Sequence, residues 1–306
     1  MSRFAAIDVG TNSVLLLVAE RGADGRFAAV QERTEITRLG RGVDQTKRLA
    51  PEAIADTLSV LESYAKEARE LGATDIVVSA TSAARDAQNG PEFLAGAQQR
   101  AGLAVEIITG DEEARLSFAS AWADFGGKGP LVVLDIGGGS TELIFGGATG
   151  QLDFRRSFDV GSVRLTERHL HADPPTAEEL ARLSVGLKDT FSALPPPPVG
   201  AHLVAVAGTA TTICTVARAI EPYDAALVHG AVLSRQEVVH AVERLAALPV
   251  VLRRTVPGLP PRRADVIVAG GLVLEAAMDA VDAAEVTISD RGLRWGLLVD
   301  RFGTRA

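Results

Sequence analysis

The chain has 306 residues, of which 47% are hydrophobic and 23% charged, and its formal net charge is −8. A chain of this length exceeds what one hydrophobic core usually fills, so two domains are expected. The acidic balance is untypical of a general nucleic-acid binder, and the sequence contains neither the ~20 consecutive apolar residues of a membrane helix nor a signal-peptide pattern.

The first 125 residues alternate between predicted strands and helices. Apolar runs around a polar turn at 4–20, then a further run at 27–37, favour three antiparallel strands. Apolar residues at helical spacing predict a helix over 51–71, which Gly72 ends. Further on, strands are predicted at 75–81 and 105–110, and helices at 91–102 and 111–125. This alternation indicates an α/β domain.

The sequence contains an internal repeat. Aligning residue 7 with residue 134 superposes Ile-Asp-Val-Gly-Thr-Asn-Ser on Leu-Asp-Ile-Gly-Gly-Gly-Ser, with Asp8 over Asp135 and Gly10 over Gly137. Each copy continues with an apolar strand, a turn of small residues and another strand. The repeat predicts two homologous domains, 1–124 and 125–306, and the helix predicted at 292–302 is a candidate to pack back on the first domain.

The remainder of the second half repeats the alternation. A helix is predicted at 176–194, and the four prolines that follow it are expected to form a surface loop inside the second domain. Residues 202–220 have a strand, glycine turn and helix pattern, in which Cys214, the single cysteine, is expected to be a core residue. The same pattern is predicted for 265–281. One cysteine excludes an internal disulfide and fits a reducing cytoplasm.

Small and hydroxyl residues follow these predicted strands. Glycine lets the backbone approach a ligand closely, and inward N–H groups and hydroxyls can bind phosphate oxygens. One such turn is more often purely structural, but two matched Asp-x-Gly turns and a Gly-Thr-x-Thr turn together favour phosphate binding. The expected phosphate-binding residues are Gly10, Thr11, Asn12, Ser13, Gly137, Gly138, Gly139, Ser140, Gly208, Thr209 and Thr211.

Asp8 and Asp135 precede the two matched turns. A carboxylate beside a phosphate is repulsive unless a cation lies between them, and Mg²⁺ is usually held by one or two carboxylates with waters and substrate oxygens. The alternative is that each Asp caps its own turn. The matched positions favour the magnesium role.

Four stretches carry a specific resemblance: AAIDVGTNS near the start, VVSATSAARDAQN at 77–89, IITGDEEARL at 107–116 and LVVLDIGGGSTEL at 131–143. Through them the chain resembles the exopolyphosphatase and guanosine pentaphosphate phosphatase family over almost its whole length. The resemblance implies an α/β fold of two actin-like, ribonuclease H-like domains flanking an active-site cleft.

The resemblance also implies roles for individual residues. Glu113 matches the family's catalytic base, and Asp135 and Glu142 match its magnesium and water ligands, with Asp8 on the opposite wall. Arg85 matches an arginine that is expected to contact phosphate. Without the resemblance, Glu113 would be an acid in the first turn of a helix, where the dipole favours negative charge.

The expected reaction is release of terminal orthophosphate from inorganic polyphosphate by Mg²⁺-assisted attack of water. The alternatives are a guanosine pentaphosphate 5′-phosphohydrolase, a non-catalytic polyphosphate or alarmone sensor, and a sugar or acid kinase of the same superfamily. Arginines after each repeat, including Arg33, Arg48 and Arg156, either form solvated faces or guide a polyanion. No nucleic-acid or membrane partner is expected, and the oligomeric state is left open, with a homodimer as one option.

Overall fold

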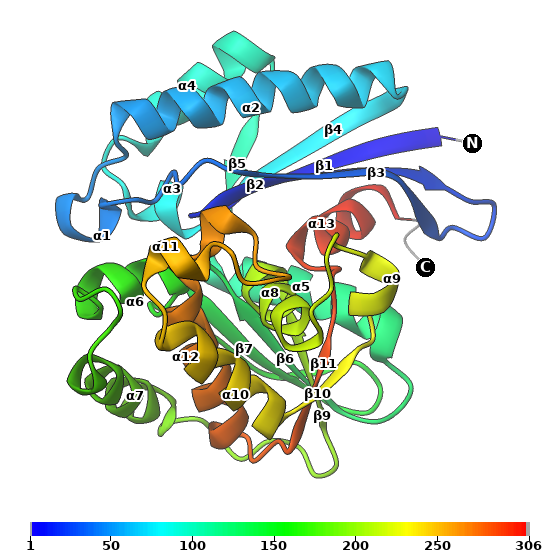
Figure 1. Cartoon of the computed structure of the whole chain (residues 1–306). Helices are drawn as coiled ribbons and strands as arrows, with labels where there is room; N and C mark the ends of the chain where they lie inside the picture. The colour runs from blue at the N-terminus through cyan, green and yellow to red at the C-terminus, as the bar shows by residue number, and fades with distance from the viewer. Residues whose placement is uncertain (1, 304–306) are drawn as a thin grey trace. The chain divides into compact units, whose positions relative to one another are not determined.

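The computed structural model describes residues 2–303 (Figure 1). One compact unit comprises Ser117–Gly292, and the other comprises the described residues before and after it. The division falls inside helix α5 (Gly110–Phe125), after Leu116 and not after residue 124. Leu116 belongs to an apolar cluster of the first unit, whereas the hydroxyl of Ser117 bonds Asp135 of the second, so one helix serves both.

The sheet of the first unit has the strand order β3-β2-β1-β4-β5. Its strands are β1 (Ser2–Val9), β2 (Ser13–Arg21), β3 (Phe27–Ile36), β4 (Ala73–Ala80) and β5 (Val105–Ile107). The first three pair antiparallel, which confirms the prediction from the apolar runs, and β4 lies parallel to β1 and to β5.

Helices pack on both faces of this sheet. They are α1 (Val43–Thr46), α2 (Pro51–Glu70), α3 (Ser82–Asp86), α4 (Gly90–Ala101), the start of α5 and α13 (Leu293–Phe302). Figure 1 shows α2 and α4 along one face. Successive strand side chains point to opposite faces, so Ile7 joins the core under α2 and Ala6 joins a second cluster with Leu297 of α13.

The sheet of the second unit has the strand order β10-β11-β9-β6-β7-β8. Its strands are β6 (Leu131–Ile136), β7 (Thr141–Gly146), β8 (Leu152–Phe158), β9 (His202–Val206), β10 (Val232–Ser234) and β11 (Glu285–Ile288). Strands β6, β7 and β8 pair antiparallel, and β9 lies parallel to β6. The order matches that of β1–β4, so the repeat in sequence is a repeat in topology.

The helices of the second unit enclose its core. They are α6 (Ser162–His169), α7 (Ala177–Phe191), α8 (Ala207–Arg218), α9 (Ala225–Val228), α10 (Arg235–Ala246), α11 (Val250–Arg253), the 3₁₀ helix η1 (Pro261–Arg263) and α12 (Ile267–Ala280). A capping box of Thr176 and Glu179 starts α7. The four prolines lie in the loop between α7 and β9, and Cys214 is buried, as predicted.

The prediction of a strand and glycine turn at 265–281 is wrong, because α12 runs straight through Gly270 and Gly271. A Cβ atom at Gly270 would lie 2.7 Å from Cγ2 of Thr209, and one at Gly271 would lie 2.4 Å from Cγ2 of Val242. These glycines therefore let α8 and α10 approach α12 closely. Periodicity alone does not separate such a buried helix from a strand followed by a turn.

None of the described helices is long and apolar enough to span a membrane. The 20-residue α2 is long enough but contains several charged side chains.

Candidate active site

The two turns of the sequence repeat have the same backbone geometry. The N–H of Gly10 donates to the carbonyl of Ser13 at 2.9 Å, and the N–H of Gly137 donates to the carbonyl of Ser140 at 3.0 Å. A Cβ atom on either glycine would lie 3.1 Å from the same serine carbonyl. Each turn joins the first strand of its sheet to the second, so the matched residues occupy matched places.

In each unit, the segment after the third strand holds the turn through its carbonyl groups. In the first unit, Gly40 and Arg38 donate backbone N–H bonds to the carbonyls of Thr11 and Asn12, at 2.8 and 3.0 Å. In the second unit, the first turn of α6 does the same, since Ser162 and Val163 donate to Gly137 and Gly138 at 3.0 and 2.9 Å. The hydrogen bonds fix which way the turns point.

Unlike the carbonyl groups of these turns, several of their backbone N–H groups have no hydrogen-bond partner among the described residues. Among the described residues, no acceptor takes the backbone N–H groups of Thr11, Asn12, Gly138 or Gly139. The buried side-chain nitrogen of Asn12 also has no acceptor there. Buried donors normally have partners, and adjacent N–H groups in a turn form a concave site for an anion. The arrangement suits phosphate oxygens.

The third predicted phosphate turn is the start of a helix. Gly208, Thr209 and Thr211 lie in the first turns of α8, directly after β9, and Ala207 makes the reversal with a left-handed φ of 67°. No side chain caps this helix end. The N-terminal N–H groups of a helix favour negative charge. These residues can therefore still bind an anion, but as the start of a helix and not as a turn.

Arg263 at the end of η1 is a residue that the sequence reading missed. Its guanidinium lies against Gly208, where a Cβ atom would come within 2.5 Å of Cζ. Burial lowers the pKa of Arg263 to about 10. Among the described residues, no oxygen accepts a hydrogen bond from this guanidinium, and it lies beside the positive end of α8. A half-buried cation in that position is stabilised by an anion.

Two buried carboxylates lie side by side in the second unit. Asp135 on β6 and Glu142 on β7 are directly opposite in the antiparallel register, so their side chains point to the same face of the sheet. Asp135 is 5% exposed and Glu142 is fully buried. Burial raises the pKa of the Asp135 carboxyl, and a hydrogen bond from the Ser117 hydroxyl opposes that rise.

This pair fits a hard cation. Two adjacent buried carboxylates repel one another, and a bound cation offsets both the repulsion and the loss of hydration. Mg²⁺ takes oxygen ligands and typically uses one or two carboxylates, with the remaining ligands from water and phosphate. Within residues 2–303 no cluster of three or more His, Cys, Asp or Glu side chains has a metal-binding arrangement.

Glu113 and Arg85 lie together in the first unit. The Arg85 guanidinium nitrogen is 3.5 Å from a carboxylate oxygen of Glu113 and donates to the carbonyl of Ile108 at 3.0 Å. Glu113 is 7% exposed, whereas Glu112 forms a two-pronged ion pair with Arg115. Glu112 therefore behaves as an ordinary acid in the first turn of a helix, whereas Glu113 is a buried carboxylate beside the guanidinium of Arg85.

The predicted residues thus fall into two sets. Asp8, the turn 10–13, Arg85 and Glu113 belong to the first unit, and the remaining predicted residues belong to the second. Within the first set, the hydroxyls of Thr11 and Ser82 share a 2.7 Å hydrogen bond, which links the turn to the start of α3. Asp8 lies opposite Leu15 and beside Ser79 in its sheet.

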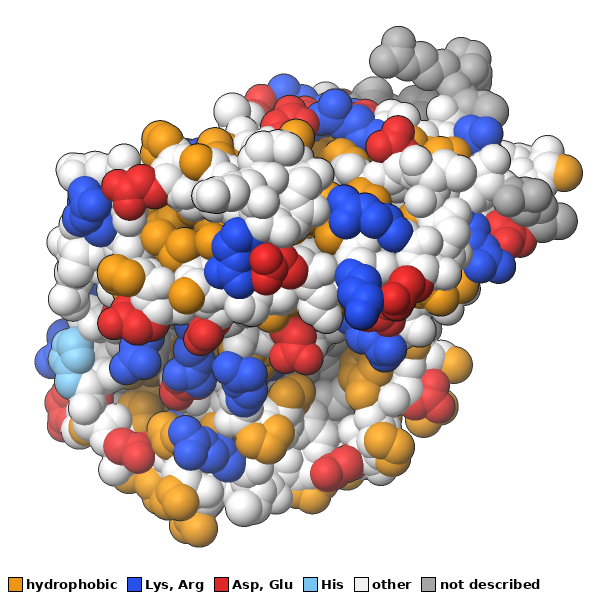
Figure 2. Space-filling view, turned by 90° about the horizontal axis from the view of Figure 1, so that it is seen from above, with side chains coloured by type: hydrophobic (Ala, Val, Ile, Leu, Met, Phe, Trp, Pro, Cys, Tyr) orange, Lys and Arg blue, Asp and Glu red, His pale blue; other side chains and the backbone are white. Residues whose placement is uncertain are grey.

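Several basic residues that follow the repeat are engaged locally. Arg33 pairs with Glu67 at 3.0 Å, and Arg156 lies over the ring of Phe158, 4.9 Å from its centroid. On the face seen in Figure 2, Lys and Arg side chains are interspersed with Asp and Glu. The mixture favours solvated faces over a single polyanion track on that side.

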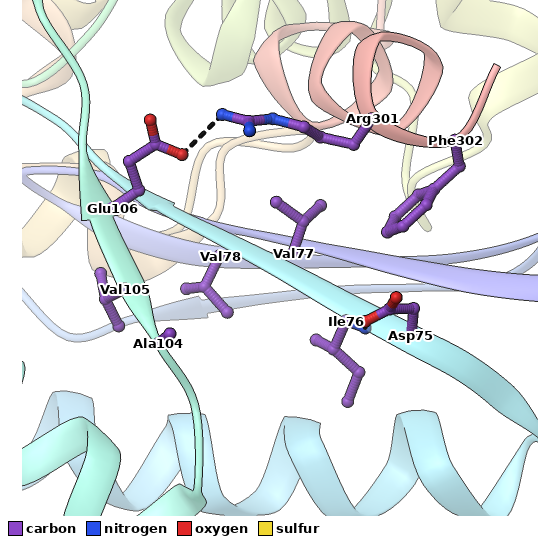
Figure 3. Close-up of a pocket in the computed structure, with 9 residues that line it drawn as sticks. All are labelled: Asp75, Ile76, Val77, Val78, Ala104, Val105, Glu106, Arg301 and Phe302. Atoms are coloured by element: carbon purple, nitrogen blue, oxygen red, sulfur yellow. Dashed lines mark hydrogen bonds and ion pairs between the residues drawn. The ribbon is translucent and has the colours of Figure 1, made fainter.

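A pocket of about 390 Å³ at the edge of the first sheet is separate from these residues (Figure 3). It is lined by parts of β4, β5 and the end of α13, including Val77 and Phe302, and an ion pair between Glu106 and Arg301 crosses it. None of the predicted site residues lines it.

The chain is similar to known proteins over nearly its whole length. The model of the Ppx/GppA phosphatase family matches residues 17–304. Exopolyphosphatase 2 of Mycobacterium tuberculosis is 38% identical over 99% of both chains, and a guanosine-5′-triphosphate,3′-diphosphate pyrophosphatase of Vibrio atlanticus is 29% identical over 98% of this chain and 60% of its own. The crystal structure of the Aquifex aeolicus Ppx/GppA protein superposes with a TM-score of 0.82 at 34% identity, covering 98% of this chain and 97% of that one.

These neighbours confirm the predicted actin-like α/β fold. The match extends over nearly the whole chain. The chain belongs to the Ppx/GppA phosphatase family, whose members hydrolyse phosphoanhydride bonds.

Proposed function

We propose that the protein is an exopolyphosphatase, which releases terminal orthophosphate from inorganic polyphosphate with Mg²⁺ as its cofactor. The observation that carries the proposal is the buried pair of Asp135 and Glu142, next to a turn whose N–H groups are open to an anion. Support also comes from the similarity to Exopolyphosphatase 2 of Mycobacterium tuberculosis over 99% of both chains.

The phosphate chain is held by backbone and arginine donors in this proposal. The turns at 10–13 and 137–140 supply N–H groups, and Asn12 adds a buried side-chain donor. In the second unit, Arg263 and the start of α8 supply positive charge. Binding by fixed dipoles and a cation requires no net positive protein, which agrees with a net charge of −8.

The chemical step is attack of water on a terminal phosphorus atom. Glu113 accepts the proton as the water oxygen bonds to phosphorus, and the bridging P–O bond breaks, so that orthophosphate and a chain shorter by one phosphate are formed. Arg85 orients Glu113 and contacts phosphate. Mg²⁺ held by Asp135 and Glu142 would offset charge on the scissile group.

The test is a panel of substrates under identical conditions. Phosphate release from short polyphosphate, long polyphosphate, guanosine pentaphosphate and ATP is measured with Mg²⁺ and with a chelator. We expect the highest kcat/KM on a polyphosphate and no turnover with the chelator. A higher kcat/KM on guanosine pentaphosphate would transfer the proposal to that substrate, which the Vibrio atlanticus relative is named for.

The same panel separates the other classes. A kinase would bind ATP tightly and transfer phosphate to an acceptor hydroxyl, whereas a sensor would bind polyphosphate without releasing phosphate. The buried carboxylate Glu113 of the first unit and the buried Asp135–Glu142 pair of the second favour an enzyme, because burying acids is costly and a protein that only binds polyphosphate gains nothing from them.

A further inference from the structure

Asp135 and Glu142 each accept a hydrogen bond from a serine on a neighbouring element. The Ser117 hydroxyl of α5 donates to Oδ2 of Asp135 at 2.5 Å, and the Ser157 hydroxyl of β8 donates to Oε1 of Glu142 at 2.7 Å. Ser157 is directly opposite Glu142 in the strand register, as Glu142 is opposite Asp135. The three strands thus present one polar row on a single sheet face.

These hydroxyl groups are built into the fold. Ser117 is fully buried, and its short bond to Asp135 is in the range of a hydroxyl donating to a charged acceptor. A buried serine destabilises a helix relative to alanine unless its hydroxyl has a hydrogen-bond partner, because a buried hydroxyl without one loses its hydration. The carboxylate of Asp135 is that partner.

We propose that Ser117 is a positioning residue that orients the Asp135 carboxylate for Mg²⁺, and that Ser157 does the same for Glu142. This inference rests on the proposed function, because it takes the carboxylate pair to be the metal site. A hydrogen bond to one carboxylate oxygen fixes the rotation of the group. Without these hydrogen bonds, the two negatively charged groups would rotate away from one another, and binding the cation would have to restrict that rotation. With them, both carboxylates are already oriented before the cation binds.

The size of the effect follows from what outer partners of metal ligands contribute elsewhere. Removing such a partner typically costs 10- to 100-fold in metal affinity or activity. We therefore expect Ser117→Ala to weaken binding of a divalent cation by roughly 10- to 100-fold, with a small effect on polyphosphate KM at saturating Mg²⁺. Ser117→Thr keeps the hydroxyl and should restore much of the affinity.

The experiment is an equilibrium titration of the full chain with Mn²⁺, used in place of Mg²⁺ because the electron paramagnetic resonance signal reports the free ion. Ser120→Ala is the matched control, since Ser120 is also a buried serine of α5 but donates to the carbonyl of Arg291. Asp135→Asn serves as the reference for loss of the metal site. Melting temperatures without metal identify variants that fold normally.

The outcomes separate the inference from the proposed function. Weaker Mn²⁺ binding in Ser117→Ala, with normal binding in Ser120→Ala, supports the positioning role. Normal Mn²⁺ binding in Ser117→Ala, together with lost binding in Asp135→Asn, overturns the positioning role and leaves the metal site intact. Normal binding in Asp135→Asn removes the metal site itself, and the inference with it. Should Ser117→Ala fail to fold, Ser157→Ala is measured against the same expectation for Glu142.

Discussion

Individual residues in the second unit carry charge that the fold alone does not balance. Arg263 lies against Gly208 beside the positive end of α8, and its pKa is lowered by burial to about 10. A half-buried cation that lies beside a positive helix end without a hydrogen-bond acceptor destabilises the protein that contains it. An anionic ligand would supply the missing partner of the Arg263 guanidinium, and a chain of phosphates is such a ligand.

Replacing Arg263 with glutamine should therefore act in opposite directions on binding and on stability. We expect affinity for short polyphosphate to fall roughly 10- to 100-fold, since hydrogen bonds to charged groups contribute about 1.5–3 kcal/mol. Without ligand the variant should melt at an equal or higher temperature, because the unpaired charge is gone. Calorimetric titration and thermal melts measure both quantities. Arg262→Gln, an exposed neighbour on the same η1 helix, is the control, and equal losses in the two variants would contradict the assignment.

Among the elements, the segment after each third strand fixes the adjoining turn. A Cβ atom at Gly161 would lie 2.6 Å from the backbone of Gly138 and Gly139. Gly40 is the counterpart in the first unit, where a Cβ atom would meet Thr11. The close approach, and not an unusual φ, is what requires glycine at 161, because its backbone is extended.

Gly161→Ala should displace the turn that the proposal assigns to phosphate. The crowding is expected to cost about 1–3 kcal/mol in unfolding free energy, and phosphate release should fall more than this loss of folded protein explains. Gly186→Ala in the interior of α7 is the control, because nothing lies within 4 Å of the added Cβ and alanine should stabilise the helix by about 0.5–1 kcal/mol. Urea unfolding and phosphate release measure the two effects, and full activity in Gly161→Ala would argue against a rigid turn.

A carboxyl group that titrates with folding, Glu275, lies on helix α12 of the second unit, away from the candidate site. Glu275 on α12 has a buried carboxyl oxygen with no hydrogen-bond partner among the described residues. Burial raises its pKa to about 7 from an ordinary value of 4.5, and the nearby charges of Glu243 and Asp279 add to the rise. The folded protein then binds more protons than the unfolded chain between these values, so stability should fall as pH rises from 4.5 to about 7 and level off above.

Glu275→Gln should remove this part of the pH dependence. After allowance for residual solvent access, we expect the variant to be more stable than the parent by about 1 kcal/mol at pH 8 and nearly equal at pH 4.5. Glu243→Gln, which removes only the nearby charge, should show a smaller change of the same sign. Unfolding free energies at a series of pH values test the prediction, and parallel curves for Glu275→Gln and the parent would contradict it.

Across the whole molecule, the sequence predicts the repeated parts best. The Asp-x-Gly turns at 8–13 and 135–140 recur with the same hydrogen bonds, because a local motif determines them. Arg263 was missed because it contacts Gly208, more than fifty residues away in the sequence, and no motif around Arg263 indicates that contact. The helix at 267–280 was misread because its two glycines serve helix packing. Tertiary contacts, which periodicity does not encode, decide all such positions.

The first unit depends on the end of the chain for part of its core. Leu297 of α13 is fully buried against β1 and β2, whereas Val299 on the same helix is 44% exposed. Leu297→Ala should cost about 2–5 kcal/mol in the unfolding of this unit, and Val299→Ala much less. Fluorescence of Trp295 in a Trp122→Phe background reports this unit, because the other tryptophan belongs to the second. An unchanged midpoint for Leu297→Ala would mean that α13 contributes little.

Glu113 provides the most direct test of the proposed reaction, since it is the group that takes the proton from water. Phosphate release from polyphosphate at saturating Mg²⁺ is compared for the parent, Glu113→Gln and Glu112→Gln, the last replacing a neighbour held in an ion pair with Arg115. We predict a fall in kcat of about 10²- to 10⁴-fold for Glu113→Gln alone, with polyphosphate affinity retained. A kcat for Glu113→Gln close to that of the parent would contradict the account and leave this carboxylate without a catalytic role.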